Sequence, residues 1–201
     1  MPDAFPTPLL CRLTAGIVLG RWDVVRAARA EADPAPDRAW REAVLQTHLF
    51  AGFPRLVEAY GVLGEVGGLG DPDPDETPGE PDRPERGREL FDRIYGGVAD
   101  AVRGTLQNAH GDFARWIEGH AYGRVLTRPG LDPDRREELA VACLAALGQD
   151  RQLMSHARGA LRLGSSPERL RAALDAIEDF VDPDALARAR RIVERVAGEA
   201  S

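Results

Sequence analysis

The sequence predicts an all-α protein, because apolar residues recur at helical spacing, capping residues mark helix starts, and strand patterns are missing. One set of apolar residues recurs strictly every fourth position and predicts a helix: Leu90, Ile94, Val98, Val102 and Leu106. Alternating β-branched runs do not occur, and Ala, Leu, Arg and Glu dominate the chain. We therefore expect a bundle of about seven to nine helices and no sheet.

The N-terminal third contains the first predicted helices. Leu9, Leu13 and Ile17 recur every fourth residue, and a second helix is expected from about 39 to 51. Gly52-Phe53-Pro54 follows it directly. Because proline lacks the backbone N–H that a helix interior needs, this tripeptide predicts a break.

Three residue pairs mark helix starts in the C-terminal part. Asp132-Pro133, Ser166-Pro167 and Asp182-Pro183 each place a capping side chain before a proline at the first helical position. Gly164 is a suitable C-terminal cap for the helix that ends before Ser166. These pairs indicate that three of the expected helices begin at the prolines.

The helical pattern disappears over residues 64–88, where Gly, Pro and acidic residues predominate. Such a segment buries too little apolar surface to order itself, so we interpret it as an exposed acidic linker. It separates an N-terminal helical half, 1–63, from a C-terminal half, 89–201, and both are expected to form one compact domain. Residues 36–59 align with 167–190 at low identity, so two related helical halves stay an alternative.

Charge and hydropathy exclude several classes of protein. All 26 basic residues are arginine, and the net charge of -7 opposes binding to a phosphate backbone. No apolar run approaches the roughly 20 residues of a membrane span. The first residues lack the positive and apolar regions of a signal peptide. We expect a cytoplasmic protein that binds neither nucleic acid nor membrane.

The cysteines and histidines do not predict a metal centre. Cys11 and Cys143 lie far apart and form no C-x-x-C pair, which argues against a disulfide framework or a zinc site. The four histidines are scattered, and none pairs with an acid four residues away as known ligand sets do. We expect neither a metal nor a cofactor.

The segment 122–174 contains a series of recognisable motifs. It reads Y-G-R-V-L-T-R-P-G-L at 122–131, R-E-E-L at 136–139, and S-H-A-R-G-A-L at 155–161. In order and spacing these motifs resemble the carboxymuconolactone decarboxylase family, which belongs to one superfamily with the AhpD-type peroxidases. The resemblance implies an AhpD-like helical bundle and a ring-like homo-oligomer, trimeric or hexameric.

A second element resembles the same family but lies in a different place. Residues 42–54 read E-A-V-L-Q-T-H-L-F-A-G-F-P, similar to an element that follows the histidine helix in ordinary members. Here it precedes His156 by about a hundred residues. The chain is either a divergent duplication or carries this element in permuted order.

The peroxidase chemistry of the superfamily is disfavoured. The resemblance implies a C-x-x-C-x-x-x-H run in the AhpD branch, and counting back from His156 puts Gln149 and Gln152 at the two cysteine positions. An amide cannot form the disulfide that this reaction needs. Cys143 lies in a run of Leu and Ala, where we expect an inert buried thiol.

The decarboxylase branch needs no thiol. The resemblance implies a small anionic lactone or keto acid, held by cationic and polar groups while a histidine or an acid moves a proton as carbon dioxide leaves. The candidate catalytic residues are His156 and either Glu137 or Glu138, between which the register does not decide. An arginine fork suits a carboxylate. The candidate substrate-binding residues are Arg128, His120 and Trp116.

Each candidate also has a structural interpretation. His156 has apolar neighbours on its helical face, and the glutamates stand in a first helical turn, where the helix dipole favours acids. Arg128 is suited to bracing a loop, and Trp116 with His120 to core packing. The alternative function is therefore a non-catalytic oligomeric protein that serves assembly or partner binding. The lyase hypothesis predicts His156, one glutamate and Arg128 around a solvent-connected pocket.

Overall fold

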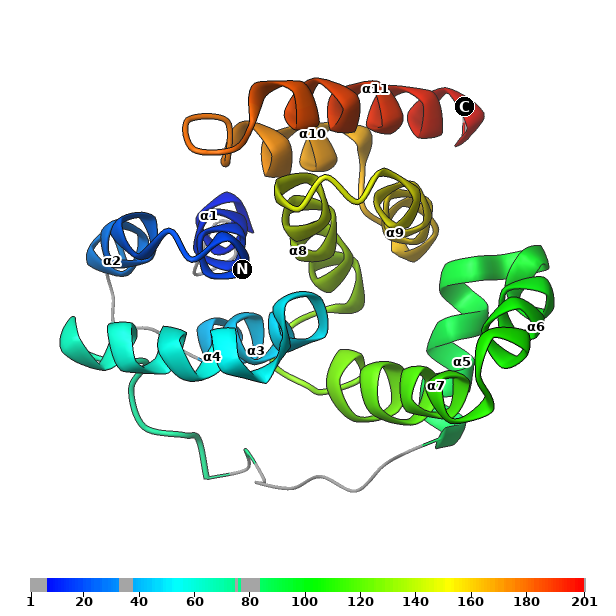
Figure 1. Cartoon of the computed structure of the whole chain (residues 1–201), viewed down its shortest axis with the longest axis horizontal. Coiled ribbons are helices and arrows are strands. Elements are labelled where there is room, and N and C mark those ends of the chain that lie inside the picture. Colours follow the sequence, from blue (N-terminus) through cyan, green and yellow to red (C-terminus); the bar gives the residue numbers. More distant parts are fainter. Residues whose placement is uncertain (1–6, 33–37, 75, 77–83, 201) are drawn as a thin grey trace.

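The computed structural model describes residues 7–32, 38–74, 76 and 84–200, and within these ranges it contains helices and no strand (Figure 1). The predicted all-α class is confirmed. The signal-peptide prediction concerns residues 1–6, which lie outside the described residues, as do residues 75 and 77–83 of the expected linker. None of the helices in the described ranges combines the length and the apolar character that a membrane span requires.

The α-helices follow one another along the chain as α1 (Thr7–Leu19), α2 (Trp22–Ala30), α3 (Arg38–Gln46), α4 (His48–Glu65), α5 (Pro84–Tyr95), α6 (Ala99–Ala109), α7 (Gly111–Trp116), α8 (Pro133–Ala146), α9 (Asp150–Leu163), α10 (Pro167–Asp175) and α11 (Pro183–Ala200). A 3-10 turn, Gly96–Val98, precedes α6, and a π-helix, η2 (Ile117–Leu126), follows α7.

The predicted helix starts agree with the structure. α8, α10 and α11 begin at Pro133, Pro167 and Pro183. The hydroxyl of Ser166 accepts a hydrogen bond from the backbone N–H of Arg169, as a capping side chain does. Gly164 ends α9 with a φ of 108°, a conformation that glycine adopts without steric cost.

Glycines interrupt stretches that apolar spacing alone predicts as one continuous helix. The run from Leu90 to Leu106 predicted one helix, but the structure separates α5 from α6 at Gly96, whose φ is +56°. Gly52, at φ +76°, interrupts α4 just before Pro54, close to the predicted break. The end of the expected linker is also helical, because α5 already begins at Pro84. The one-helix prediction over 90–106 was incorrect because it weighed apolar spacing above the single residue Gly96. The predicted end of the linker at 88 was also incorrect.

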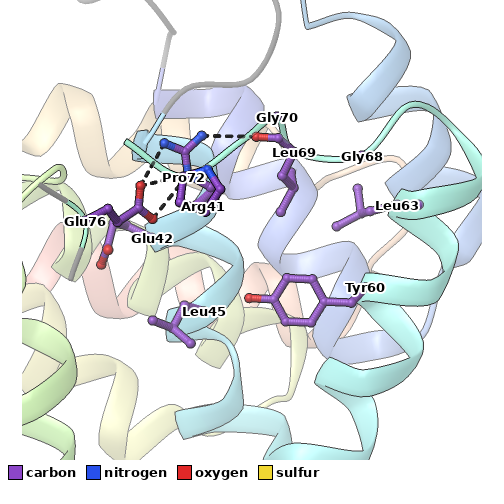
Figure 2. Close-up of a pocket in the computed structure, with 11 residues that line it drawn as sticks. Arg41, Glu42, Leu45, Tyr60, Leu63, Gly68, Leu69, Gly70, Pro72 and Glu76 are labelled. Atoms are coloured by element: carbon purple, nitrogen blue, oxygen red, sulfur yellow. Dashed lines mark hydrogen bonds and ion pairs between the residues drawn. The ribbon is translucent and has the colours of Figure 1, made fainter. Parts of the chain in front are cut away.

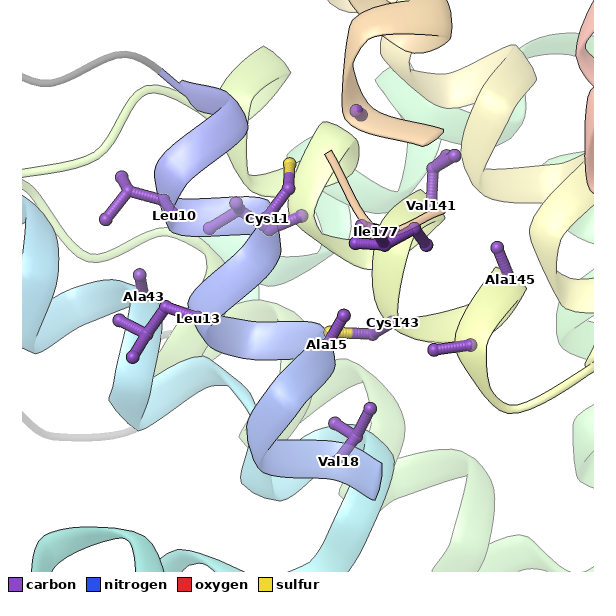
Figure 3. Packing of buried hydrophobic residues seen from close by; sticks show 14 of the residues in the cluster. Leu10, Cys11, Leu13, Ala15, Val18, Ala43, Val141, Cys143, Ala145 and Ile177 are labelled. Carbon is purple, nitrogen blue, oxygen red and sulfur yellow. The ribbon is translucent and has the colours of Figure 1, made fainter. Parts of the chain in front are cut away.

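Helix α8 forms the centre of the molecule. Its residues from Arg136 to Ala146 are all buried, and α1, α9, α10 and α11 pack around it. Small side chains on α8 let α1 approach closely, and Figure 3 shows Cys143 beside Ala15 of α1. The N-terminal half therefore contributes to the same hydrophobic core as the C-terminal half. This core also surrounds the thiol of Cys143, and burial raises its pKa to about 12.

A smaller apolar cluster lies between α5 and η2. Its buried members are Leu90, Phe91, Ile94, Ala99, Tyr122 and Leu126. Gly87 of α5 is what allows the two helices to meet. A Cβ at this position would lie 2.4 Å from the carbonyl oxygen of Glu118 and 2.7 Å from the backbone nitrogen of Gly123. Backbone atoms cannot yield as a flexible side chain can.

We predict that Gly87→Ala lowers the free energy of unfolding by about 1–3 kcal/mol, because the added methyl group overpacks the contact between α5 and η2. Urea denaturation measures this change. Gly61→Ala is the matched control, because that exposed helical glycine has open space where its Cβ would stand. It should be neutral or stabilising by up to about 1 kcal/mol. Equal stability of the two variants would refute the packing role of Gly87.

Candidate functional site

Helices α8 and α9 bring a histidine and a glutamate together. Nδ1 of His156 lies 2.8 Å from Oε2 of Glu137. The Glu137 side chain is 1% exposed, whereas that of His156 is 14% exposed and so reaches solvent. Of the two glutamates that the sequence left open, Glu137 is therefore the partner of His156.

Two neighbours shape the space around this pair. Gly159, on α9, leaves room for the carboxylate, because a Cβ there would lie 2.9 Å from Oε2 of Glu137 and 2.8 Å from Cγ2 of Ile94. The ring of Phe50 stands edge-on to the ring of His156, with 6.2 Å between the centroids. Phe50 belongs to the displaced F-A-G-F-P element. This element therefore packs against the histidine despite its distance in sequence.

The electrostatics favour the charged form of His156. Burial by itself would lower the pKa of His156, because it penalises the imidazolium. The charge of Glu137 and its hydrogen bond act in the opposite direction, and the pKa of His156 is raised above its ordinary value. At neutral pH the pair therefore holds a proton more firmly than a free histidine does.

Glu138 faces a different part of the molecule. It accepts a hydrogen bond from the hydroxyl of Ser165, and Nε of Arg169 lies 2.8 Å from its Oε1. Its other carboxylate oxygen, Oε2, is buried and has no hydrogen-bond partner among the residues that the structure describes. Burial raises the pKa of Glu138 despite these contacts. Glu138 thus connects α8 to the start of α10, a structural role that differs from the predicted one, because Glu138 stands beyond the first turn of α8.

Arg128 also has a partner other than His156. Its guanidinium pairs with Glu42 of α3, with Nε 2.9 Å and 3.0 Å from the two carboxylate oxygens. Arg136 binds the same carboxylate from the first turn of α8 at 2.8 Å. The predicted grouping of Arg128 with His156 is not found among the described contacts, because a buried glutamate already occupies the arginine fork.

Trp116 and His120, the other two predicted substrate-binding residues, differ in their surroundings. Trp116, at the end of α7, is 67% exposed. His120, in η2, places its Nε2 2.8 Å from Nε2 of His48, at the start of α4. The sequence treated both as candidates for one pocket because they stand four residues apart. In the structure one side chain faces solvent and the other contacts α4.

Two tyrosines close to Glu137 were not predicted as site residues. The hydroxyl of Tyr122 donates to that of Tyr95 across 3.3 Å, and both rings pack on Phe91. Burial is the main cause that raises the pKa of Tyr95 and of Tyr122, and the negative charge of Glu137 adds to it. Tyr122 opens the motif at 122–131, but the resemblance assigns it no role, and Tyr95 belongs to no motif.

A separate pocket of about 390 Å³ lies between α3, α4 and the segment that follows α4 (Figure 2). Arg41 closes one side, because its guanidinium binds the carboxylate of Glu76 and the carbonyl oxygen of Leu69. Tyr60 points into the pocket from α4. Neither His156 nor Glu137 lines it. The pocket and the histidine–glutamate pair are therefore two distinct features.

Comparisons with known proteins locate a family match in the C-terminal half. A model of the carboxymuconolactone decarboxylase family matches residues 111–195, a range that includes both His156 and Glu137. Peroxisomal protein 2 of Schizosaccharomyces pombe is 26% identical over 155 residues, which cover 75% of this chain and 72% of that protein. The 4-carboxymuconolactone decarboxylase of Acinetobacter baylyi is 33% identical over 67 residues, which cover 33% of this chain and 50% of the enzyme.

We predict that Glu137→Gln lowers the pKa of His156, because burial then acts without the opposing carboxylate charge. NMR titration of the imidazole ring measures the midpoint, and the exposed ring of His110 serves as an internal reference. Because the pKa of His156 is higher in the folded state than in the unfolded state, protonation of His156 stabilises the folded protein. This stabilisation is complete below the unfolded-state pKa and is lost as the pH rises through the folded-state pKa. The variant should lose this pH dependence. An unchanged midpoint would contradict the assigned pair.

Proposed function

This chain carries a carboxymuconolactone decarboxylase family domain at residues 111–195, and on that premise we propose that it is a cofactor-free lyase acting on a small carboxylated lactone or keto acid. The single observation that carries the proposal is the pair of His156 and Glu137, 2.8 Å apart and nearly buried. The carboxylate holds Nδ1, so Nε2 is the ring nitrogen directed to a reacting molecule.

The pair can supply the proton that a decarboxylation consumes. The bond to the carboxylate carbon breaks, carbon dioxide leaves, and the electron pair moves into the conjugated carbonyl of the substrate. Nε2 of His156 then gives its proton to the carbon, and the imidazole regains a proton from solvent. Glu137 orients the ring and stabilises its charged form, in agreement with the raised pKa of His156. No redox step or thiol is needed.

Disulfide peroxidase activity stays disfavoured. Gln149 and Gln152 stand before His156 at the positions where the resemblance implies cysteines. The two cysteines of the chain, Cys11 and Cys143, are both buried free thiols. Burial raises the pKa of each thiol, which opposes formation of the reactive thiolate.

The substrate and the cellular location form part of the same proposal. Phe50 borders His156, which suits a small planar molecule. The imidazolium of His156 provides the positive charge for an anionic substrate, because the Arg128 fork already binds Glu42. We propose a cytoplasmic location, although the relative from Schizosaccharomyces pombe is named as a peroxisomal protein.

A second candidate function is assembly or partner binding without catalysis. It is favoured by exposed apolar side chains on one face of α4, where Phe53 and Val57 are 66% and 68% exposed and stand one helical turn apart. Exposed apolar side chains at that spacing suit an interface. A homo-oligomer, trimeric or hexameric, would cover them and is also compatible with the lyase.

We predict that the protein decarboxylates carboxymuconolactone and that His156→Ala lowers kcat by roughly 10²–10⁴-fold, the usual contribution of a general acid. Carbon dioxide release over a range of substrate concentrations separates kcat from KM. His110→Ala is the matched control and should retain full activity, because that side chain is exposed and accepts a hydrogen bond from the backbone N–H of Asp112.

Two results would contradict the lyase proposal. One is that the unaltered protein and His156→Ala release carbon dioxide at the same rate, equal to the background rate, with carboxymuconolactone and with small keto acids. The other is equal loss of activity in the His110 control. The first result together with a stable oligomer would support the assembly function instead.

A further inference from the structure

Two histidines that are 72 residues apart in sequence face each other through the same ring atom. Nε2 of His48 lies 2.8 Å from Nε2 of His120, and the two ring planes are inclined by 64°. No sequence motif groups these two residues. From this arrangement we propose that His48 and His120 form a two-nitrogen site for a late first-row divalent metal ion such as Zn²⁺, Ni²⁺ or Cu²⁺, for which imidazole is a preferred ligand.

The surroundings of His48 set its protonation state. Nδ1 of His48 faces the carbonyl oxygen of Leu45, which can only accept a hydrogen bond. The proton of the neutral ring therefore sits on Nδ1, and Nε2 presents a lone pair to His120. A histidine that donates its second ring nitrogen to a backbone carbonyl is the arrangement that orients metal-bound imidazoles in proteins. His48 is in this sense already oriented as a ligand.

Both rings are held in place by their elements. Phe53 stacks on the ring of His48 with 5.3 Å between centroids and an interplanar angle of 9°. His120 lies near the middle of η2, whose ten residues form a π-helix. π-Helical turns are rare and occur frequently at functional sites, because they shift side chains away from regular helical positions. Here the shifted turn contributes the side chain that meets His48.

The separation of the two nitrogens is close to what a bound ion requires. Two imidazole nitrogens at about 2.0–2.1 Å from a tetrahedral zinc ion lie roughly 3.3–3.4 Å apart. The rings thus need to separate by only about 0.5 Å. On binding, the proton of His120 moves from Nε2 to Nδ1 through solvent, and both Nε2 lone pairs bind the metal. A neutral pair therefore releases no net proton.

The two histidines would fill two coordination positions of the ion. Among the residues that the structure describes, no group of three or more His, Cys, Asp or Glu side chains could hold a metal ion. Water, or a carboxylate of a small molecule or a second copy of the chain, would complete the coordination. His48 is 9% exposed and His120 is half-buried, so the site lies just beneath the surface, next to the exposed ring of Phe53. Such a site binds metal reversibly and does not support folding.

The test uses binding and not activity, so it is independent of the proposed lyase function. Isothermal titration with NiCl₂ and electron paramagnetic resonance with one equivalent of Cu²⁺ are applied to the full chain. We expect one site per chain, with hyperfine structure from two nitrogens. His48→Gln and His120→Gln should each weaken binding about tenfold or more, whereas His110→Gln should leave it unchanged. Circular dichroism of the metal-free variants controls for folding.

A measurement on the unaltered protein makes the test independent of the variants. Co²⁺ should shift or broaden the ring signals of His48 and His120 at lower concentration than those of His110 and His156. The proposal is overturned by an absence of one-site binding. It is equally overturned by affinity that neither glutamine variant changes, or by Co²⁺ effects that appear first at His110 or His156.

Discussion

The buried carboxylate of Glu42 joins the two halves of this protein. Its side chain is 1% exposed and is bound by Arg128 and by Arg136, which is itself 1% exposed. Gln46 adds a hydrogen bond to the backbone carbonyl of Arg136. Burial of such charges is costly unless each one is paired, so α3 must stay against the loop before α8. Because Glu137 directly follows Arg136, the position of the carboxylate that orients His156 depends on this cluster.

The same arrangement explains how a displaced element reaches the site. Glu42 begins the stretch that leads through α3 to Phe50, and fixing α3 on α8 carries Phe50 to the edge of the His156 ring. The N-terminal half therefore provides one wall around the pair, while the segment that matches the family model provides the pair itself. The start of α4 also supplies His48, which meets η2. One buried ion cluster thus organises both the proposed lyase site and the proposed metal site.

Local signals predicted much of the fold but little of the site. The prolines at 133, 167 and 183 and the cap at Gly164 act within a few residues, so the sequence alone indicates these helix ends. The pairing of His156 with a glutamate followed from the resemblance, but the choice of Glu137 required the relative rotation of α8 and α9. Contacts such as Arg128 with Glu42 join residues 86 positions apart, and only tertiary packing determines them. The sequence does not show that Glu42 pairs with Arg128, so Arg128 was predicted to bind a substrate instead.

A double-mutant cycle between Glu42 and Arg128 tests the joining cluster most directly. Urea unfolding of Glu42→Gln, Arg128→Met and the double variant gives the coupling free energy, and the exposed pair Arg26 and Glu65 is the matched control. Each single change should cost about 1.5–3 kcal/mol, because it removes a bond to a charged group. The double variant should lose less than the sum, with a coupling of about 0.5–3 kcal/mol. Additive losses, or a coupling no larger than that of the control pair, would contradict the account.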